Sequence, residues 1–402
     1  MGIERFFSKI KKEWNTFTDL YSPYKNNIKG NKLFIDFNSI IYSIYPKIKN
    51  INNKDNFERV LLQKVNEYIG ELYDIFNKKL KLIYIAIDGV PSNGKILEQR
   101  KRAYVGQFIK RLIDEKYKSN KFEWSKSNIK PGTDFMNKLY NSLLKLNFNN
   151  CDIVISSHNE PGEGEMKIIL YIINNGYKDG IIFSPDSDMI ILILLLDNNV
   201  KNRFYLFRLD QQLSIKNNNI VYNYSDIWSI KQVILNYIDD KIGYNFTEEM
   251  KEQIIKEIMY IYTFFGNDFL PPSETIKIST DIYYLLDCYI YNYIKNGNIM
   301  NKNKNWEINI TNLLSLLQIM EKHEFIFLKR NYYEKKYERF ESNLNGLFYM
   351  NIVKLYTNIK SLKTKIFKSD IYKKILKNKD NVPNMNFGFF KYKAIKFIKW
   401  KN

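Results

Sequence analysis

Four short apolar runs rich in Ile, Val, Phe or Tyr occur in the first half of the chain, each five to eight residues long. Between them, apolar residues recur at helical spacing. Strands that alternate with helices predict a mainly parallel sheet covered by helices on both faces. We therefore expect an α/β fold, with strands at Lys32–Phe37, Lys81–Asp88, Asp152–Ser157 and Gly180–Ser184.

The rest of the chain predicts further elements. Lys201–Tyr224 is expected to hold edge strands or a hairpin, and Asp226 to cap the helix that follows it. The polar stretch Tyr117–Lys130 is expected to be a loop near the substrate path. We expect a catalytic domain over residues 1–272, a helical extension over 273–343 and a Lys- and aromatic-rich segment over 344–402.

Acidic residues follow the ends of the predicted strands. Ligands gather at the carboxyl ends of parallel strands, so acids placed there are expected to lie together. A single such acid is more simply a helix cap or a loop residue, but several at equivalent places indicate a shared site. The candidates are Asp36, Asp88, Glu163, Glu165, Asp186 and Asp188, with Asp268 after a later apolar stretch.

Carboxylates this close repel one another, and a helix N-terminus offsets only about 0.3–1 kcal/mol of that cost. Divalent cations with oxygen ligands offset more, and clusters without His or Cys favour magnesium or manganese. Two such ions are a recurring device for phosphodiester cleavage. We expect Gly162 and Gly164 to let the backbone bend closely around the ions.

The chain is strongly basic, with a formal net charge of +19, which favours a nucleic-acid partner. Residues 351–402 hold 14 Lys and two acids, together with nine aromatic residues. Such a segment can grip a nucleic-acid backbone and stack its bases, or form a small helical domain with a basic face. We expect a cytoplasmic protein, because we find no signal peptide and no apolar run long enough to span a membrane.

A basic helix is expected to begin near Lys95, just after the strand that leads to Asp88. Lys95, Gln99 and Arg102 are spaced so that they share one helix face, and Arg100 lies beside them. Charge, an amide and a guanidinium fork together suit a phosphate. The alternative is an ordinary solvated basic face.

The motifs occur in the order found in the Xrn family of 5′→3′ exoribonucleases, which the chain resembles over residues 1 to about 275. The similar stretches are MGIERFF (1–7), LFIDFNSIIY (33–42), IAIDGVPSNGKILEQRKR (85–102), PGTDFM (131–136), NEPGEGEMK (159–167), SPDSDMIIL (184–192) and FFGNDFLP (264–271). The resemblance implies a fold like that of PIN domains and flap nucleases, with a helical C-terminal region. It also suggests a shortened member of viral type.

The resemblance implies that the seven acids bind two catalytic Mg²⁺ ions, with Mn²⁺ as the expected substitute. It implies that Lys95, Gln99 and Arg102 hold the 5′-monophosphate of single-stranded RNA, which is cleaved to 5′-mononucleotides. The family usually has a second arginine at Ala103 and histidines at Tyr42 and Met166; Tyr42 can still stack on a base.

Two other functions stay open at this point. A flap-endonuclease-like enzyme would act on branched DNA, but the expected Gly-rich helix-hairpin-helix is absent from Gly266 to Ile278. A catalytically silent RNA-binding protein would have lost acids, and all seven are present. DNA as a further substrate of the exonuclease also stays open.

Overall fold

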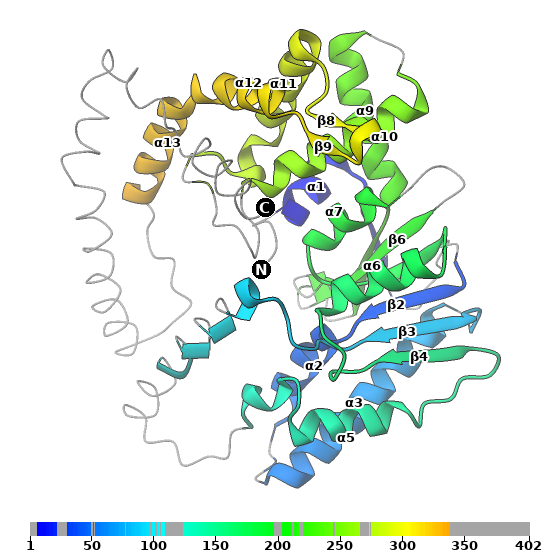
Figure 1. Ribbon diagram of the computed structural model, residues 1–402. Helices are drawn as coiled ribbons and strands as arrows, with labels where there is room; N and C mark the ends of the chain where they lie inside the picture. Colours follow the sequence, from blue (N-terminus) through cyan, green and yellow to red (C-terminus); the bar gives the residue numbers. More distant parts are fainter. Residues whose placement is uncertain are drawn as a thin grey trace. The chain divides into compact units, whose positions relative to one another are not determined.

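The computed structural model describes most of the first 337 residues (Figure 1). The described residues are 6–21, 30–49, 51, 53–76, 78–96, 99–100, 103–104, 106–108, 124–196, 203–210, 213–214, 216, 220–243, 246–265, 273 and 275–337. They belong to two compact units. The first contains the described residues up to Ile96 and those from 124 to 263; the second contains the others.

A mixed sheet forms the first unit. Among the described residues seven strands pair in the order β1-β7-β6-β5-β2-β3-β4. All pairings in this sheet are parallel except those of β7, which runs antiparallel to both β1 and β6. The strands are β1 (Thr18–Tyr21), β2 (Lys32–Asp36), β3 (Leu82–Ala86), β4 (Asp152–Ser156), β5 (Gly180–Phe183), β6 (Phe204–Leu209) and β7 (Val221–Asp226).

The four apolar runs form the centre and one edge of this sheet, as predicted. Each strand ends one or two residues earlier than expected from the sequence. The central strand β2 pairs in register with two neighbours, Leu33 lying opposite Ile83 of β3 and Ile181 of β5. The mainly parallel α/β fold is confirmed.

Helices cover both faces of the sheet (Figure 1). On one face, α2 (Asn38–Ile44), α3 (Lys54–Ile75) and α5 (Asp134–Leu143) share a core with β2 and β3. On the other face, α6 (Gly164–Asn174) packs on β2 and β3. There Tyr171 stacks on Tyr84 with ring centroids 4.0 Å apart. The two-sided cover explains why the central strands are mostly apolar.

The first unit also contains α1 (Phe6–Trp14), α7 (Asp188–Leu195), α9 (Ile227–Ile242) and α10 (Glu248–Thr263). The side chain of Asp226 accepts a hydrogen bond from the Trp228 amide at 3.1 Å, which confirms it as the cap of α9. On α1, the Lys11 ammonium pairs with Asp19 at 2.8 Å and Asp210 at 3.0 Å, which ties this helix to the end of β6.

Two connections can be compared with their predictions. The stretch Lys201–Tyr224 contains β6 and part of β7, which pair antiparallel, so the hairpin prediction is confirmed. Residues 117–123 of the predicted loop Tyr117–Lys130 lie outside the described residues, and in the rest two residues are buried while most of the others are exposed. Trp124 is buried against Phe57 and Phe135, and the 3₁₀ helix η2 (Lys126–Ile129) follows it.

The second unit contains the predicted helical region. Helices α11 (Ile278–Asn296), α12 (Ile310–Glu321) and α13 (Glu324–Tyr337) are joined in part by a short hairpin of β8 (Met300–Asn301) and β9 (Glu307–Ile308). Arg330 donates to both carboxylate oxygens of Asp281, at 2.6 and 2.7 Å. Residues 344–402 lie outside the described residues, and the domain boundaries stay predictions. None of the described helices combines the length and apolarity that a membrane crossing requires.

Candidate active site

Acidic side chains meet at the carboxyl edge of the central strands. Asp36 is the last residue of β2, and Asp88 follows β3 by two residues. Glu163 occupies the N-cap position of α6 without a side-chain cap hydrogen bond, and Glu165 lies in the first turn of that helix. Asp186 lies between β5 and α7, and Asp188 is the first residue of α7. Parallel neighbours end at one edge of a sheet, so the topology brings these six positions together.

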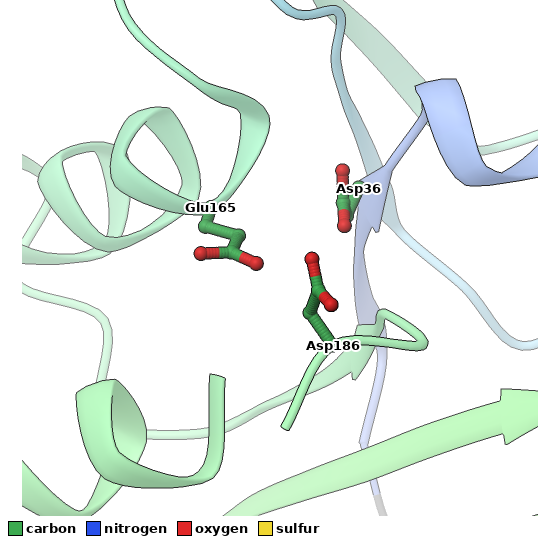
Figure 2. Close-up of side chains that lie close together, drawn as sticks. All are labelled: Asp36, Glu165 and Asp186. Atoms are coloured by element: carbon green, nitrogen blue, oxygen red, sulfur yellow. The ribbon is translucent and has the colours of Figure 1, made fainter. Parts of the chain in front are cut away.

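Three of the carboxylates come closest. Asp36, Glu165 and Asp186 each offer one oxygen, and these oxygens all lie within 4.8 Å of one another. Figure 2 shows their carboxyl groups facing a common space, Asp36 from the end of β2, Glu165 from α6 and Asp186 from the loop after β5. A single ion of the size of Mg²⁺ can bind oxygens from several such side chains.

Burial makes this arrangement costly for ionised acids. Desolvation, followed by the charges of Asp88 and Asp186, raises the pKa of Asp36 well above its usual range. Desolvation and the neighbouring Asp186, Asp36 and Asp188 raise the pKa of Glu165 to about 10. Buried like charges are stable when a cation balances them. A bound cation would therefore stabilise the ionised forms of these carboxylates.

Hydrogen bonds hold several of the acids in place. The Ser184 hydroxyl donates to Asp36 Oδ2 at 2.9 Å, and the Asp186 amide donates to that same hydroxyl oxygen at 3.1 Å. Asp88 accepts a hydrogen bond at Oδ1 from the Gly164 amide at 2.7 Å. Burial, the largest effect, still raises the pKa of Asp88. The carboxylates are thus oriented by their neighbours.

Two glycines are required where α6 begins. A Cβ on Gly164 would lie 2.8 Å from Asp36 Oδ1 and 3.3 Å from Asp88 Oδ1, so a side chain there would displace the acids. Gly162 has a φ of +106°, which other residues rarely adopt. The expectation that these glycines permit close approach is met at Gly164, where the backbone abuts the carboxylates themselves.

Lys95 lies beside the acids as well as at the start of the predicted basic helix. Residues 93–96 are helical. The Lys95 ammonium is 3.0 Å from Glu163 Oε1, and both side chains are largely buried. The sequence placed Lys95 in a phosphate clamp, and no local pattern indicated that this lysine also pairs with one of the acids.

The remaining predicted site residues are Gln99, Arg100, Arg102, Asp268 and Tyr42. Gln99 and Arg100 are exposed and belong to the second unit, so their part in a clamp stays a prediction. Arg102 and Asp268 lie outside the described residues. Tyr42 lies on α2 with 48% of its surface exposed; burial of its hydroxyl and the charge of Asp88 raise its pKa.

Sequence reasoning missed three polar residues that support the acids. Ser184 contacts Asp36 and Asp186, Asn38 accepts from the Asp88 amide at 3.2 Å, and Lys167 is a buried residue of α6. Each lies inside a motif quoted above, within four residues of an acid. Their proximity in sequence was the available signal, but their partners come from other strands.

Comparison with known proteins agrees with this arrangement. The family model for the N-terminus of the Xrn 5′-3′ exonucleases matches residues 1–210, and the model for the Xrn1 helical domain matches residues 249–386. A protein of Acanthamoeba polyphaga mimivirus that is named among the 5′-3′ exonucleases is 31% identical over 258 residues. That alignment covers 59% of this chain and 41% of the relative.

5′-3′ exoribonuclease 1 of Saccharomyces cerevisiae is 28% identical over 304 residues, which cover 67% of this chain and 19% of the yeast protein. The chain thus spans well under half the length of these relatives. Among solved structures, the catalytic core of Rad2 in complex with DNA substrate overlaps 82% of this chain and 85% of its own, with a TM-score of 0.40 and 13% identity.

The match to the N-terminal family model extends over more than half of the chain and includes six of the seven predicted acids. The second model matches the region of the helices that follow the sheet. The chain belongs to the family of Xrn 5′-3′ exonucleases.

Proposed function

We propose that the protein is a divalent-metal-dependent 5′→3′ exoribonuclease that hydrolyses single-stranded RNA with a 5′-monophosphate to 5′-mononucleotides. One observation carries the proposal: the oxygens of Asp36, Glu165 and Asp186 lie within 4.8 Å of one another at the carboxyl edge of the sheet. The names of the curated relatives support the same reaction and substrate class.

The donor set fits magnesium. The group consists of carboxylates alone, and hard oxygen ligands suit Mg²⁺ and Mn²⁺ better than zinc or copper. The raised pKa values of Asp36 and Glu165 mark a site where a cation would favour the ionised forms. We propose two Mg²⁺ ions, for which Mn²⁺ substitutes.

Each acid then has a role. Asp36, Glu165 and Asp186 would hold the first ion, and Asp88, Glu163, Asp188 and Asp268 would complete the coordination of the pair. When bound, the ions lower the pKa of a water and stabilise the charge that develops on the leaving oxygen. The Ser184 hydroxyl and the Gly164 amide donate hydrogen bonds to Asp36 and Asp88, and these bonds would orient the two carboxylates as ligands.

The basic residues select the 5′ end of the RNA. Lys95 is the residue that the contacts support best, because its ammonium already lies 3.0 Å from Glu163 and so places a positive charge at the acidic site. Gln99, Arg100 and Arg102 complete the proposed clamp around the 5′-phosphate. The half-exposed ring of Tyr42 is available to stack on the first base.

The test uses purified protein, Mg²⁺ and three matched single-stranded RNAs labelled at the 3′ end. They carry a 5′-monophosphate, a 5′-triphosphate or a 5′-hydroxyl. The proposal expects only the monophosphate RNA to shorten from its 5′ side, and EDTA to stop the reaction. Labelled DNA of the same sequence in a parallel reaction measures the preference for ribose.

Two outcomes would contradict the proposal. Internal cuts that ignore the 5′ end would identify an endonuclease, and a branched DNA substrate would then be the one to examine. Tight RNA binding without cleavage in Mg²⁺ or Mn²⁺ would indicate a binding protein that uses the same basic surface.

A further inference from the structure

Helix α6 carries a buried lysine in its first turn. Only 7% of the Lys167 surface is exposed. Its ammonium donates to the carbonyl of Ile87 at 2.7 Å and to the carbonyl of Ser157 at 2.8 Å. Ile87 follows β3 and Ser157 follows β4. One side chain therefore joins the helix to the ends of two adjacent strands.

The two carbonyls lie close to the acidic site in the chain. Ile87 is bonded to Asp88, so the hydrogen bond from Lys167 fixes the backbone from which that carboxylate projects. On the helix side, the Lys167 amide donates to the Glu163 carbonyl at 3.0 Å, in the turn that also carries Glu165. Lys167 thus spans the gap between acids that come from two elements.

Burying the Lys167 ammonium, which joins α6 to the ends of β3 and β4, carries a desolvation cost. Desolvation lowers the pKa of Lys167, while the charges of Glu160 and Asp88 act in the opposite direction. An apolar side chain of similar length would fill the space without that penalty. The two hydrogen bonds to carbonyls offset this desolvation cost, and they set the distance between α6 and β3.

We propose that Lys167 is a positioning residue of the acidic site, which sets where α6 places Glu163 and Glu165 relative to Asp88. The proposal rests on the metal-binding role proposed above for these acids. Lys167 does not touch substrate or ion in this assignment. It acts through the acids, and its removal should change how strongly they bind metal.

The first experiment measures metal binding without RNA. Mn²⁺ is titrated into the 402-residue chain and the free ion is followed by electron paramagnetic resonance. Lys167→Met keeps the length of the side chain and removes its donors. We expect the Mn²⁺ dissociation constant to rise about 10–100-fold, the usual effect of removing a residue that orients ligands.

Lys231→Met is the matched control. Lys231 lies on α9 and is also only 7% exposed, so the same substitution removes a second buried ammonium from the same unit. Both variants are expected to melt at a lower temperature. Only Lys167→Met should lose Mn²⁺ affinity, and equal affinity in wild type and Lys167→Met would overturn the positioning role.

The second readout separates positioning from lower stability. In the RNA cleavage assay, Lys167→Met should need a higher Mg²⁺ concentration for half-maximal rate and recover activity as Mg²⁺ is raised. A variant that is merely less folded would keep the wild-type midpoint at a lower rate. If Lys167→Met does not fold, Lys167→Arg is used instead. We expect a smaller increase in the Mg²⁺ concentration for half-maximal rate, and no increase would contradict the proposal.

The same titration distinguishes the two proposals. Wild-type protein that binds no Mn²⁺ would refute the metal site, and the positioning role would fall with it. Wild-type binding with an unaffected Lys167→Met would refute the positioning role alone.

Discussion

At the scale of single residues, the acidic site depends on how closely its parts approach. The oxygens of Asp36, Glu165 and Asp186 share a space of a few ångströms, and the backbone of Gly164 fills the room beside Asp36 and Asp88. Because these groups are so close together, replacing one oxygen by an amide nitrogen, or adding one methyl group, should lower the cleavage rate. RNA binding should change much less.

Asp186→Asn should abolish most cleavage and leave RNA binding largely intact. The amide replaces a ligand oxygen with a weaker donor, and a loss of several kcal/mol of charge stabilisation corresponds to about 100-fold or more in rate. Single-turnover cleavage and a filter-binding assay measure the two properties. Asp179→Asn, at the opposite end of β5 in a pair with Lys32, is the control and should cleave normally. Full activity in Asp186→Asn would refute the assignment.

Gly164→Ala should lower activity about 10–100-fold by displacing the ligands. The added Cβ would meet Asp36 Oδ1 at 2.8 Å and the Ala86 carbonyl at 3.1 Å, and such overpacking should cost about 1–3 kcal/mol of stability. Urea unfolding and cleavage rates measure both effects. Gly70→Ala is the control, because nothing lies within 4 Å of its Cβ in α3, and it should gain about 0.5–1 kcal/mol.

At the scale of elements, the site exists because a strand end, a strand-to-helix loop and a helix N-terminus converge. Asp36 comes from β2, Asp186 from the loop between β5 and α7, and Glu165 from α6. The short helix over residues 93–96 adds Lys95 to the same edge. Because these elements bring several charged side chains together, the stability of the protein should depend on pH. The short helix that carries Lys95 should affect which RNA ends are cleaved.

Metal-free protein should become less stable as pH rises. Burial raises the pKa of Glu165 from 4.5 to about 10 and also raises that of Asp36. The folded state then binds more protons than the unfolded state between these values, so stability is greatest at low pH and is lost toward pH 10. Melting temperatures in EDTA across pH 5–9 test this. Added Mg²⁺ should flatten or reverse the trend, and a rising melting temperature in EDTA would contradict it.

Lys95→Ala should weaken the preference for 5′-monophosphate over 5′-hydroxyl RNA. A charge-assisted hydrogen bond contributes about 1.5–3 kcal/mol, which corresponds to roughly 10–100-fold in that preference. Competition between the two RNAs in one reaction measures it directly. Lys251→Ala removes a lysine–glutamate pair of the same 3.0 Å length from α10 and should change nothing. An unaltered preference in Lys95→Ala would remove Lys95 from the clamp.

Many of the strands, and the acids at their ends, could be predicted from the sequence for a physical reason. A strand buried on both faces is almost continuously apolar, so β2, β3 and β5 were visible as runs, and parallel ends then placed Asp36, Asp88 and Asp186 together. Contacts between segments that are distant in the chain could not be predicted from the sequence in this way. The carbonyls bound by Lys167, the hydroxyl of Ser184 on Asp36 and the burial of Trp124 depend on packing that no local pattern encodes.

At the scale of the whole molecule, positive charge is concentrated toward the C-terminus. Residues 351–402 lie outside the described residues and hold 14 of the chain's 62 Lys and Arg. A basic segment of this kind contributes to nucleic-acid affinity through counterion release, largely without regard to sequence. Its contribution can therefore be measured separately from catalysis.

Removal of residues 351–402 should weaken RNA binding and make it less sensitive to salt. For each phosphate that the shortened protein no longer neutralises, the slope of log affinity against log salt concentration should fall by about 0.7 for a single strand. Fluorescence anisotropy at several salt concentrations measures the slope. An unchanged slope would show that the segment binds no phosphates and serves another purpose.

The strand order has a consequence for how the protein is made. As the chain leaves the ribosome, β2, β3 and β4 can pair in turn, because each new strand adds to the growing edge. β5 then inserts on the other side of β2, and β1 finds its partner β7 only at residues 221–226. Since Asp186 follows β5, a nascent chain has no complete acidic triad until more than 180 residues have emerged. All residues of the triad are thus synthesised before the last two strands of the sheet, β6 and β7, which begin at Phe204 and Val221.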